Sequence, residues 1–273
     1  IYAFSEKAVE FINESSQPFM MYLAYNAVHT PMQATDEDMA KFEGHPRQKL
    51  AAMTYALDRG VGTVIRGLKD SGKFDNTLIF FLSDNGGATT NQSSNYPLKG
   101  FKGNKFEGGH RVPYFVVWKN GIPAGKPYDG LVSSLDIFAT AIDAASISKT
   151  RNRLDGVSLL PYLKGKKGEP HKVLYWRKMD TRAIRSGDYK LIITHGVDSV
   201  LYNIRRDPEE MNNLINKEPD LYRKLAKKLA KWEKNECIEP SWLEEGWRKI
   251  TNRYHQQLMH NEIKTAQDLY KKK

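Results

Sequence analysis

The chain has 273 residues, of which 40% are hydrophobic and 27% charged, as is ordinary for a globular protein. Its single cysteine excludes an intramolecular disulfide and a cysteine-rich zinc site, and no apolar run is long enough to cross a bilayer. The net charge of +10 favours anionic partners, although a solvated lysine-rich helix face late in the chain would also explain it. The length predicts one large domain with a smaller appendage.

Hydrophobic periodicity predicts alternating helices and apolar strands in the first half of the chain. In chain order we expect a helix at 3–15, a buried strand at 19–26, a loop and short acidic helix within 28–42, a long helix at 47–72, strands at 77–83 and 112–119, and a helix at 135–146. Continuous apolar strands separated by helices imply a mainly parallel sheet covered on both faces.

After residue 165 the pattern changes to short, alternating segments with tight polar breaks such as Ser186-Gly187-Asp188. These segments predict a small antiparallel sheet. An amphipathic helix follows at 218–235, with four large apolar side chains expected to face inward: Leu221, Leu225, Leu229 and Trp232. Beyond Cys237 the pattern is weak, and we assign no element there.

The strand at 77–83 delivers Asp84 and Asn85 to the carboxyl edge of the predicted sheet, where ligands bind in parallel α/β folds. A carboxylate and an amide offer hard oxygen donors that suit calcium or magnesium. Gly86 and Gly87 allow a sharp turn and a close backbone approach. An Asx turn with no ligand is the simpler interpretation of this segment taken alone.

Two further clusters are predicted at the same edge. His29 follows the strand at 19–26 and could donate a hydrogen bond or carry a proton, although a lone loop histidine is more often a surface residue. The glycine-rich segment 97–113 contains three lysines and could cradle an oxyanion, but it lacks the order of a P-loop. Within it, Glu107 and Arg111 are expected to pair and brace the loop. A hard-metal pair, a histidine and a lysine loop together suit hydrolysis of an ester with a tetrahedral oxyanion.

Four segments occur in order along the chain: "YNAVHTP", "DNTLIFFLSDNGG", "PLKGFKGNKFEGGHRVP" and "LDGVSLLPYLKG". In this order and spacing they resemble the C-terminal half of the type I sulfatases, of the alkaline-phosphatase-like superfamily. The similarity extends from about Phe4 to about Trp232. It implies an α/β fold with a mainly parallel sheet flanked by helices, plus a small C-terminal antiparallel sheet with a packed helix. The implied division is residues 1–165 as part of the catalytic α/β domain, 166–235 as the small sheet subdomain, and 236–273 as an extension.

The resemblance implies a role for four residues of this chain. Asp84 and Asn85 match the pair that binds a divalent cation, usually calcium, with magnesium as the alternative. His29 and Lys102 match residues that contact the sulfate ester. Lys102 lies five residues before Glu107, as the family pattern requires, whereas Lys99 and Lys105 do not match it. His110 stands where the family usually has a small or apolar residue. It could face the substrate, but we expect it at the surface.

Part of the family's active site is missing from these residues. The C/S-x-P-x-R motif, whose first residue becomes the formylglycine nucleophile, does not occur, nor do the two consecutive aspartates that complete the metal site. We therefore expect a missing N-terminal half of the same protein to supply them, and the fragment alone to be inactive. By resemblance, the protein is expected in the periplasm or outside the cell.

The predicted function is that of a sulfatase that acts on a sulfate ester, with the net charge favouring a sulfated polysaccharide. One alternative is a phosphatase or phosphonate esterase of the same superfamily. Another is a non-catalytic polyanion-binding protein, whose affinity would fall steeply with salt. No nucleic-acid motif is present and no membrane partner is expected.

Overall fold

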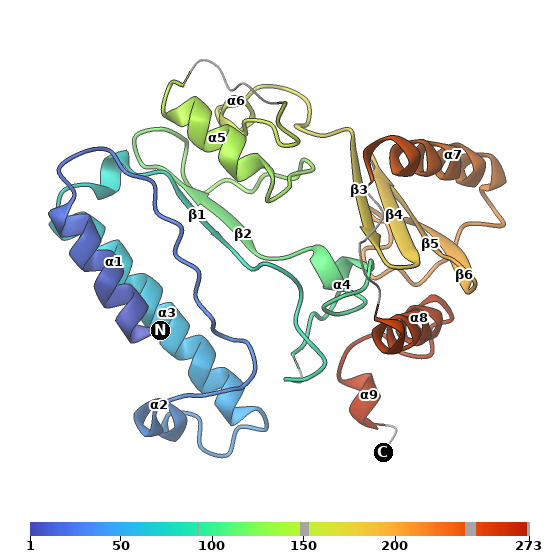
Figure 1. Cartoon of the computed structure of the whole chain (residues 1–273), viewed down its shortest axis with the longest axis horizontal. Coiled ribbons are helices and arrows are strands. Elements are labelled where there is room, and N and C mark those ends of the chain that lie inside the picture. Colours follow the sequence, from blue (N-terminus) through green and yellow to red (C-terminus); the bar gives the residue numbers. More distant parts are fainter. Residues whose placement is uncertain (92, 148–152, 238–243, 272–273) are drawn as a thin grey trace. The chain divides into compact units, whose positions relative to one another are not determined.

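The computed structural model describes residues 1–91, 93–147, 153–237 and 244–271 (Figure 1). The helices and strands in these ranges are, in order, α1 (Tyr2–Glu14), α2 (Asp36–Ala40), α3 (Gln48–Asp70), the 3-10 turn Phe74–Asn76, β1 (Ile79–Leu82), α4 (Glu107–His110), β2 (Tyr114–Val117), α5 (Asp136–Ala144), α6 (Leu160–Leu163), β3 (Val173–Lys178), β4 (Thr181–Ser186), β5 (Tyr189–Thr194), β6 (Asp198–Asn203), α7 (Pro219–Glu236), α8 (Glu245–Met259) and α9 (Asp268–Lys271). None of these helices combines the length and apolarity that a membrane span requires. The chain forms two compact units, residues 1–80 with 116–126 and residues 81–115 with 127–273.

The first unit is built on the packing of α1 against α3, which confirms the two predicted helices. Ala8 and Ile12 are buried between them, and a Cβ added at Gly67 would come within 2.8 Å of a valine methyl on α1. Phe4 and Phe11 of α1 remain 45% exposed. Their rings contact Tyr25 and Phe19, which belong to the segment after α1 and not to α3.

The predicted strand at 19–26 is not formed within the described residues. Met20 is 68% exposed and Tyr22 is 91% exposed, so the apolar run is not buried either. An extended segment becomes a strand only when a neighbour satisfies its backbone N–H and C=O groups. The apolar pattern of residues 19–26 therefore predicted a buried strand, but no neighbouring segment among the described residues pairs with it as a strand.

The two later apolar strands are confirmed, because β1 and β2 are hydrogen-bonded neighbours in a two-stranded sheet. Phe81 and Phe115, one from each strand, lie with ring centroids 6.2 Å apart. The predicted helix at 135–146 is confirmed as α5.

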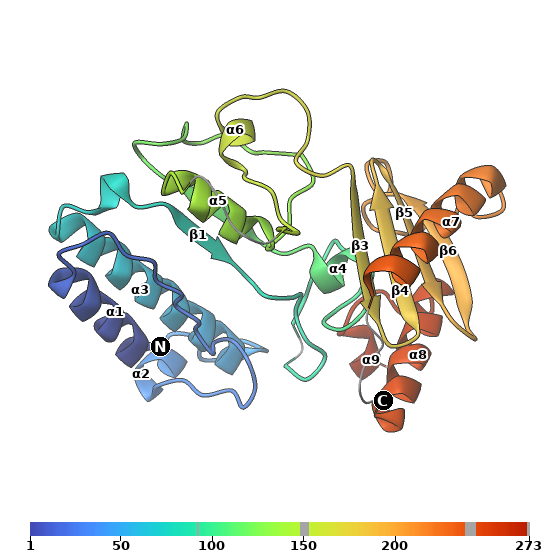
Figure 2. The same cartoon turned by 45° about the horizontal axis from the view of Figure 1, so that its top comes forward.

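In the second unit, β3, β4, β5 and β6 form an antiparallel sheet in sequence order, as predicted. Helix α7 lies on one face of this sheet and α8 on the other (Figure 2). Alternate residues supply the two faces, as strand geometry requires. The face toward α7 buries Ile184, Leu191, Leu201, Leu225 and Leu229. The face toward α8 buries Ala183, Ile192, Val200, Tyr202 and Leu258.

The C-terminal extension, to which no element was assigned, contains α8 and α9. Leu258 and Met259 of α8 pack in one cluster with Phe101 and Phe106 of the glycine-rich segment. This segment therefore lies in a core shared by the small sheet and the extension, and the extension contributes directly to holding it.

Candidate active site

The turn after β1 presents two hard oxygen donors side by side. The Asp84 side chain is exposed, and the Asn85 amide nitrogen donates a hydrogen bond to its carboxylate. The Ser83 hydroxyl donates to the Asn85 carbonyl oxygen at 2.8 Å and steadies the turn. In this rotamer the amide nitrogen faces Asp84. With the amide turned over, the two side chains would supply oxygens for part of a calcium or magnesium shell, which needs at least six oxygens. The described residues hold no group of three or more His, Cys, Asp or Glu side chains that would complete it.

Gly86 and Gly87 dock this turn onto the glycine-rich segment. The Gly86 N–H donates to the Gly109 carbonyl oxygen at 3.1 Å, and the Lys102 N–H donates to the Gly87 carbonyl oxygen at 3.0 Å. A Cβ at Gly86 would lie 1.8 Å from the Gly108 carbonyl oxygen, so no other residue fits without a backbone shift. The structure thus brings together Asp84, Asn85 and the backbone of Lys102, whose side chain is exposed.

A buried ion network anchors the other end of the glycine-rich segment. Lys190 Nζ of β5 lies 2.8 Å from Glu107 Oε1 and 3.0 Å from Glu210 Oε1. The Glu107 N–H donates to Glu210 Oε2 at 2.6 Å, so that carboxylate also caps the start of α4. Arg111 lies 3.6 Å from Glu107, which confirms the predicted pair, but Lys190 is the closer partner. The network ties α4 to the small sheet.

Burial and charge act in opposite directions on the two carboxyls. Burial opposes the ionisation of Glu107, but the charge and hydrogen bond of Lys190, together with the charges of His110 and Arg185, outweigh it and lower the pKa of Glu107. Burial raises the pKa of Glu210, and the Coulombic attraction of Lys190 only partly offsets that effect. One lysine therefore faces two buried carboxyls that bind protons with different affinity. The pKa of Glu107 is lowered and the pKa of Glu210 is raised.

The residues that did not match the family pattern point into the protein. Lys99 is fully buried, and its Nζ donates to the Glu210 carbonyl oxygen at 3.0 Å and to Asn261 Oδ1 at 2.5 Å. The expected surface position of His110 is wrong, because its ring packs against Trp176 with centroids 4.5 Å apart. Burial lowers the pKa of His110 well below its usual value. This histidine fills the space between α4 and the sheet.

His29 belongs to the first unit, whereas Asp84, Asn85 and Lys102 belong to the second. Its side chain is exposed, and Nδ1 lies 2.6 Å from the Thr30 carbonyl oxygen. The structure therefore groups three of the four predicted site residues in one unit.

Comparison with known proteins places this geometry in a family. A model of the family described as Sulfatase matches residues 2–147, and a model described as N-sulphoglucosamine sulphohydrolase, C-terminal, matches residues 102–235. The chain therefore belongs to the sulfatase family. Its fold is alkaline-phosphatase-like, as the sequence predicted, and the small C-terminal antiparallel sheet is confirmed.

Relatives and a solved structure agree with this assignment. The uncharacterized sulfatase YdeN of Escherichia coli is 44% identical over 59% of this chain and 30% of its own length. The N-acetylgalactosamine-6-sulfatase of Canis lupus familiaris is 32% identical over 68% of this chain and 36% of its own length. The crystal structure of Ps i-CgsB in complex with k-i-k-neocarrahexaose matches with a TM-score of 0.81 and 36% identity, covering 92% of this chain and 58% of that one. The chain thus spans about a third of these curated relatives.

Proposed function

We propose that the protein carrying this chain is a sulfatase that removes sulfate from an organic sulfate ester, with a sulfated glycan as substrate. The observation that supports this most directly is the docking of the Asp84–Gly87 turn onto the Lys102 loop through two backbone hydrogen bonds. It joins two hard oxygen donors to an exposed ammonium group in a member of the sulfatase family. The neighbour solved with a carrageenan oligosaccharide and the net charge of +10 support a polyanionic glycan.

In this proposal each residue has one role. Asp84 and Asn85 hold part of a calcium site, with magnesium as the alternative. Lys102 binds a sulfate oxygen and stabilises the charge that develops on it. His29 of the first unit donates a proton to the oxygen of the departing alcohol. A bound cation would supply positive charge to the sulfate oxygens.

The proposal requires a further polypeptide segment that supplies the formylglycine nucleophile and the paired aspartates, since neither motif occurs in these 273 residues. We also propose that residues 1–165 contribute to the catalytic α/β domain, 166–235 form the small sheet subdomain, and 236–273 form an extension. For location we propose the periplasm or the outside of the cell, which fractionation of the source organism would test.

Lys102→Ala tests the catalytic proposal in the polypeptide that carries both this chain and the formylglycine segment. Loss of one preorganised charge contact lowers kcat by roughly a hundredfold or more. We expect that loss in 4-nitrophenyl sulfate hydrolysis, with Lys228→Ala on the exposed face of α7 as the matched control. Near-normal turnover of the Lys102 variant would reject the assignment.

The same assay separates the alternatives. Faster hydrolysis of 4-nitrophenyl phosphate or a phosphonate ester than of the sulfate would favour phosphoryl chemistry. If neither ester is cleaved, while heparin is bound with steep salt dependence and without calcium, the protein is a polyanion binder.

A further inference from the structure

We propose that Lys105 and Lys178 form a second anion-binding site beside Lys102, which receives another acidic group, a sulfate or a carboxylate, of the glycan whose sulfate ester is cleaved. This inference rests on the proposed function and narrows its substrate to glycans with two neighbouring acidic groups.

The backbone brings the two lysines to the same short loop. Lys178 is the last residue of β3, and a Cβ built at Gly103 would lie 3.0 Å from its Nζ. Gly103 directly follows Lys102 and has φ +96°, a conformation that turns the loop sharply. Lys105 stands two residues further along. An anion at this loop would therefore lie within a few residues of the proposed sulfate-binding lysine.

The charge around these lysines is not balanced. Among the described residues, no carboxylate forms an ion pair with Lys105 or Lys178, whereas Lys190 has two carboxylate partners. Burial, followed by the charges of Lys178 and Lys190, lowers the pKa of Lys105 to about 8. Burial and then the charge of Lys102 lower the pKa of Lys178. Half-buried cations that repel one another without a counter-charge indicate a place where an anion binds.

A buried histidine belongs to the same cluster. His255 of α8 has no exposed surface, and its Nε2 has no hydrogen-bond partner within the described residues. Burial lowers the pKa of His255 to about 4, and the charges of Lys105 and Lys178 act in the same direction. An anion that neutralised the two lysines would remove the part of this pKa shift that their charges cause.

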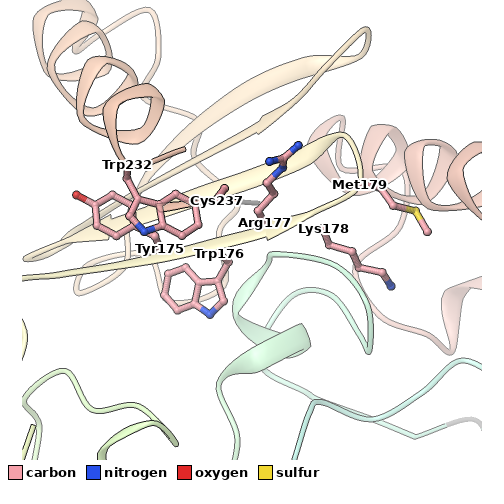
Figure 3. A pocket seen from close by; sticks show the side chains of 7 residues that line it. All are labelled: Tyr175, Trp176, Arg177, Lys178, Met179, Trp232 and Cys237. Atoms are coloured by element: carbon pink, nitrogen blue, oxygen red, sulfur yellow. The ribbon is translucent and has the colours of Figure 1, made fainter. Parts of the chain in front are cut away.

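There is room for a sugar next to Lys178. A cavity of about 550 Å³ lies along β3, where Lys178 and Trp176 project from one face of the strand (Figure 3). Arg177 and the stacked rings of Tyr175 and Trp232, whose centroids are 4.9 Å apart, line it from the other face. That volume is in the range of small-molecule sites. Arg177 lies 3.4 Å from Glu233, so part of its charge is already compensated. On the face of β3 that carries Lys178, the ring of Trp176 suits the apolar face of a sugar.

Kinetics with two substrates test the inference. In the active polypeptide, Lys178→Ala is expected to lower kcat/KM for a multiply sulfated carrageenan oligosaccharide at least about tenfold more than for 4-nitrophenyl sulfate, because a charge-assisted hydrogen bond is lost. The loss should appear mainly as a higher KM for the oligosaccharide. Lys178→Arg should retain most of the kcat/KM of the unaltered polypeptide. Lys228→Ala should leave kcat/KM unchanged for both substrates. Equal losses on both substrates would overturn the inference.

A second measurement distinguishes a failure of the anion-site inference from a failure of the proposed sulfatase function. Inorganic sulfate is expected to slow the acetylation of Lys105 and Lys178 by acetic anhydride but not that of Lys228. Suppose that the unaltered polypeptide hydrolyses neither 4-nitrophenyl sulfate nor the carrageenan oligosaccharide but that sulfate protects the two lysines. The catalytic proposal then fails and the anion site stands. Hydrolysis without protection, and without a substrate-dependent effect of Lys178→Ala, refutes the site alone. Oligosaccharides whose second acid is a sulfate or a uronate then identify the preferred group.

Discussion

At the scale of single residues, Gly86 leaves the least room for change. A Cβ there would lie 1.8 Å from the Gly108 carbonyl oxygen, and backbone cannot swing aside as a side chain can. Gly86→Ala must therefore separate the turn after β1 from the glycine-rich loop. We expect a stability loss of at least about 2 kcal/mol, measured by urea unfolding, and weaker calcium binding, measured by calorimetry.

Gly246→Ala is the matched control for that variant, since nothing lies within 4 Å of a Cβ at Gly246 and the residue is in α8. Alanine is the better helix former, so this variant should be neutral or more stable by up to about 1 kcal/mol. If Gly86→Ala behaved like Gly246→Ala, the close contact with Gly108 would not limit the turn.

At the scale of elements, α8 packs against the glycine-rich loop through Tyr254 and Leu258, and it also carries a buried, neutral histidine. The pKa of His255 is lowered to about 4, whereas an unfolded histidine titrates near its ordinary value of 6.5. Between these two values the unfolded chain binds a proton that the folded chain does not. The contribution of His255 to the free energy of unfolding should therefore fall as the pH drops from about 6.5 to about 4, by at most on the order of 3 kcal/mol, with no further loss from this residue below that window.

Urea unfolding at a series of pH values measures this dependence. His255→Gln removes the titrating group, so its stability should change less with pH across the same interval. Glu107 and Asp268, whose pKa values are lowered, act below about 4.5. Two other buried groups act inside the window: His110, whose pKa is lowered, adds to the loss, and Glu210, whose pKa is raised to about 7, opposes it. The contribution of His255 is therefore the difference between the two proteins. The same slope in both proteins would show that His255 is not the cause.

The elements differ in how well their apolar pattern predicts them. In α7, Leu225 and Leu229 are buried leucines at helical spacing, and the helix was predicted. In α8 the buried positions are Thr251, His255, Leu258 and Met259, so two polar residues interrupt the apolar stripe and the helix was missed. The run at 19–26 has the opposite property, because it is apolar enough to predict a strand but has no hydrogen-bonding neighbour among the described residues.

At the scale of the whole molecule, the proposed cation site links folding to calcium. A ligand that binds only the folded state stabilises it by about 2.7 kcal/mol at a hundred times its Kd. We expect calcium to raise the melting temperature of the complete protein, and Asp84→Ala to abolish that increase. Differential scanning fluorimetry across a calcium series measures it.

Asp58→Ala, an exposed aspartate on α3, is the control that should keep the full calcium response. If calcium still raised the melting temperature of the Asp84 variant, the cation would have to bind elsewhere in the protein. Retention of the shift with magnesium but not calcium would identify the other hard cation as the resident one.

From the order and spacing of their motifs, the residues by themselves determined the family, the alkaline-phosphatase-like fold, the antiparallel C-terminal sheet and the candidate residues. The family, its fold and the candidate residues rest on the resemblance of four motifs in order and spacing, and the antiparallel sheet rests on local alternation. A linear pattern contains both kinds of information. Only the tertiary structure decided that Lys99 and His110 are buried, that Lys190 bridges Glu107 and Glu210 across 83 and 20 positions, and that Lys178 reaches Gly103. Burial and counter-charge come from residues far apart in the chain, so they are set by packing and not by sequence neighbours.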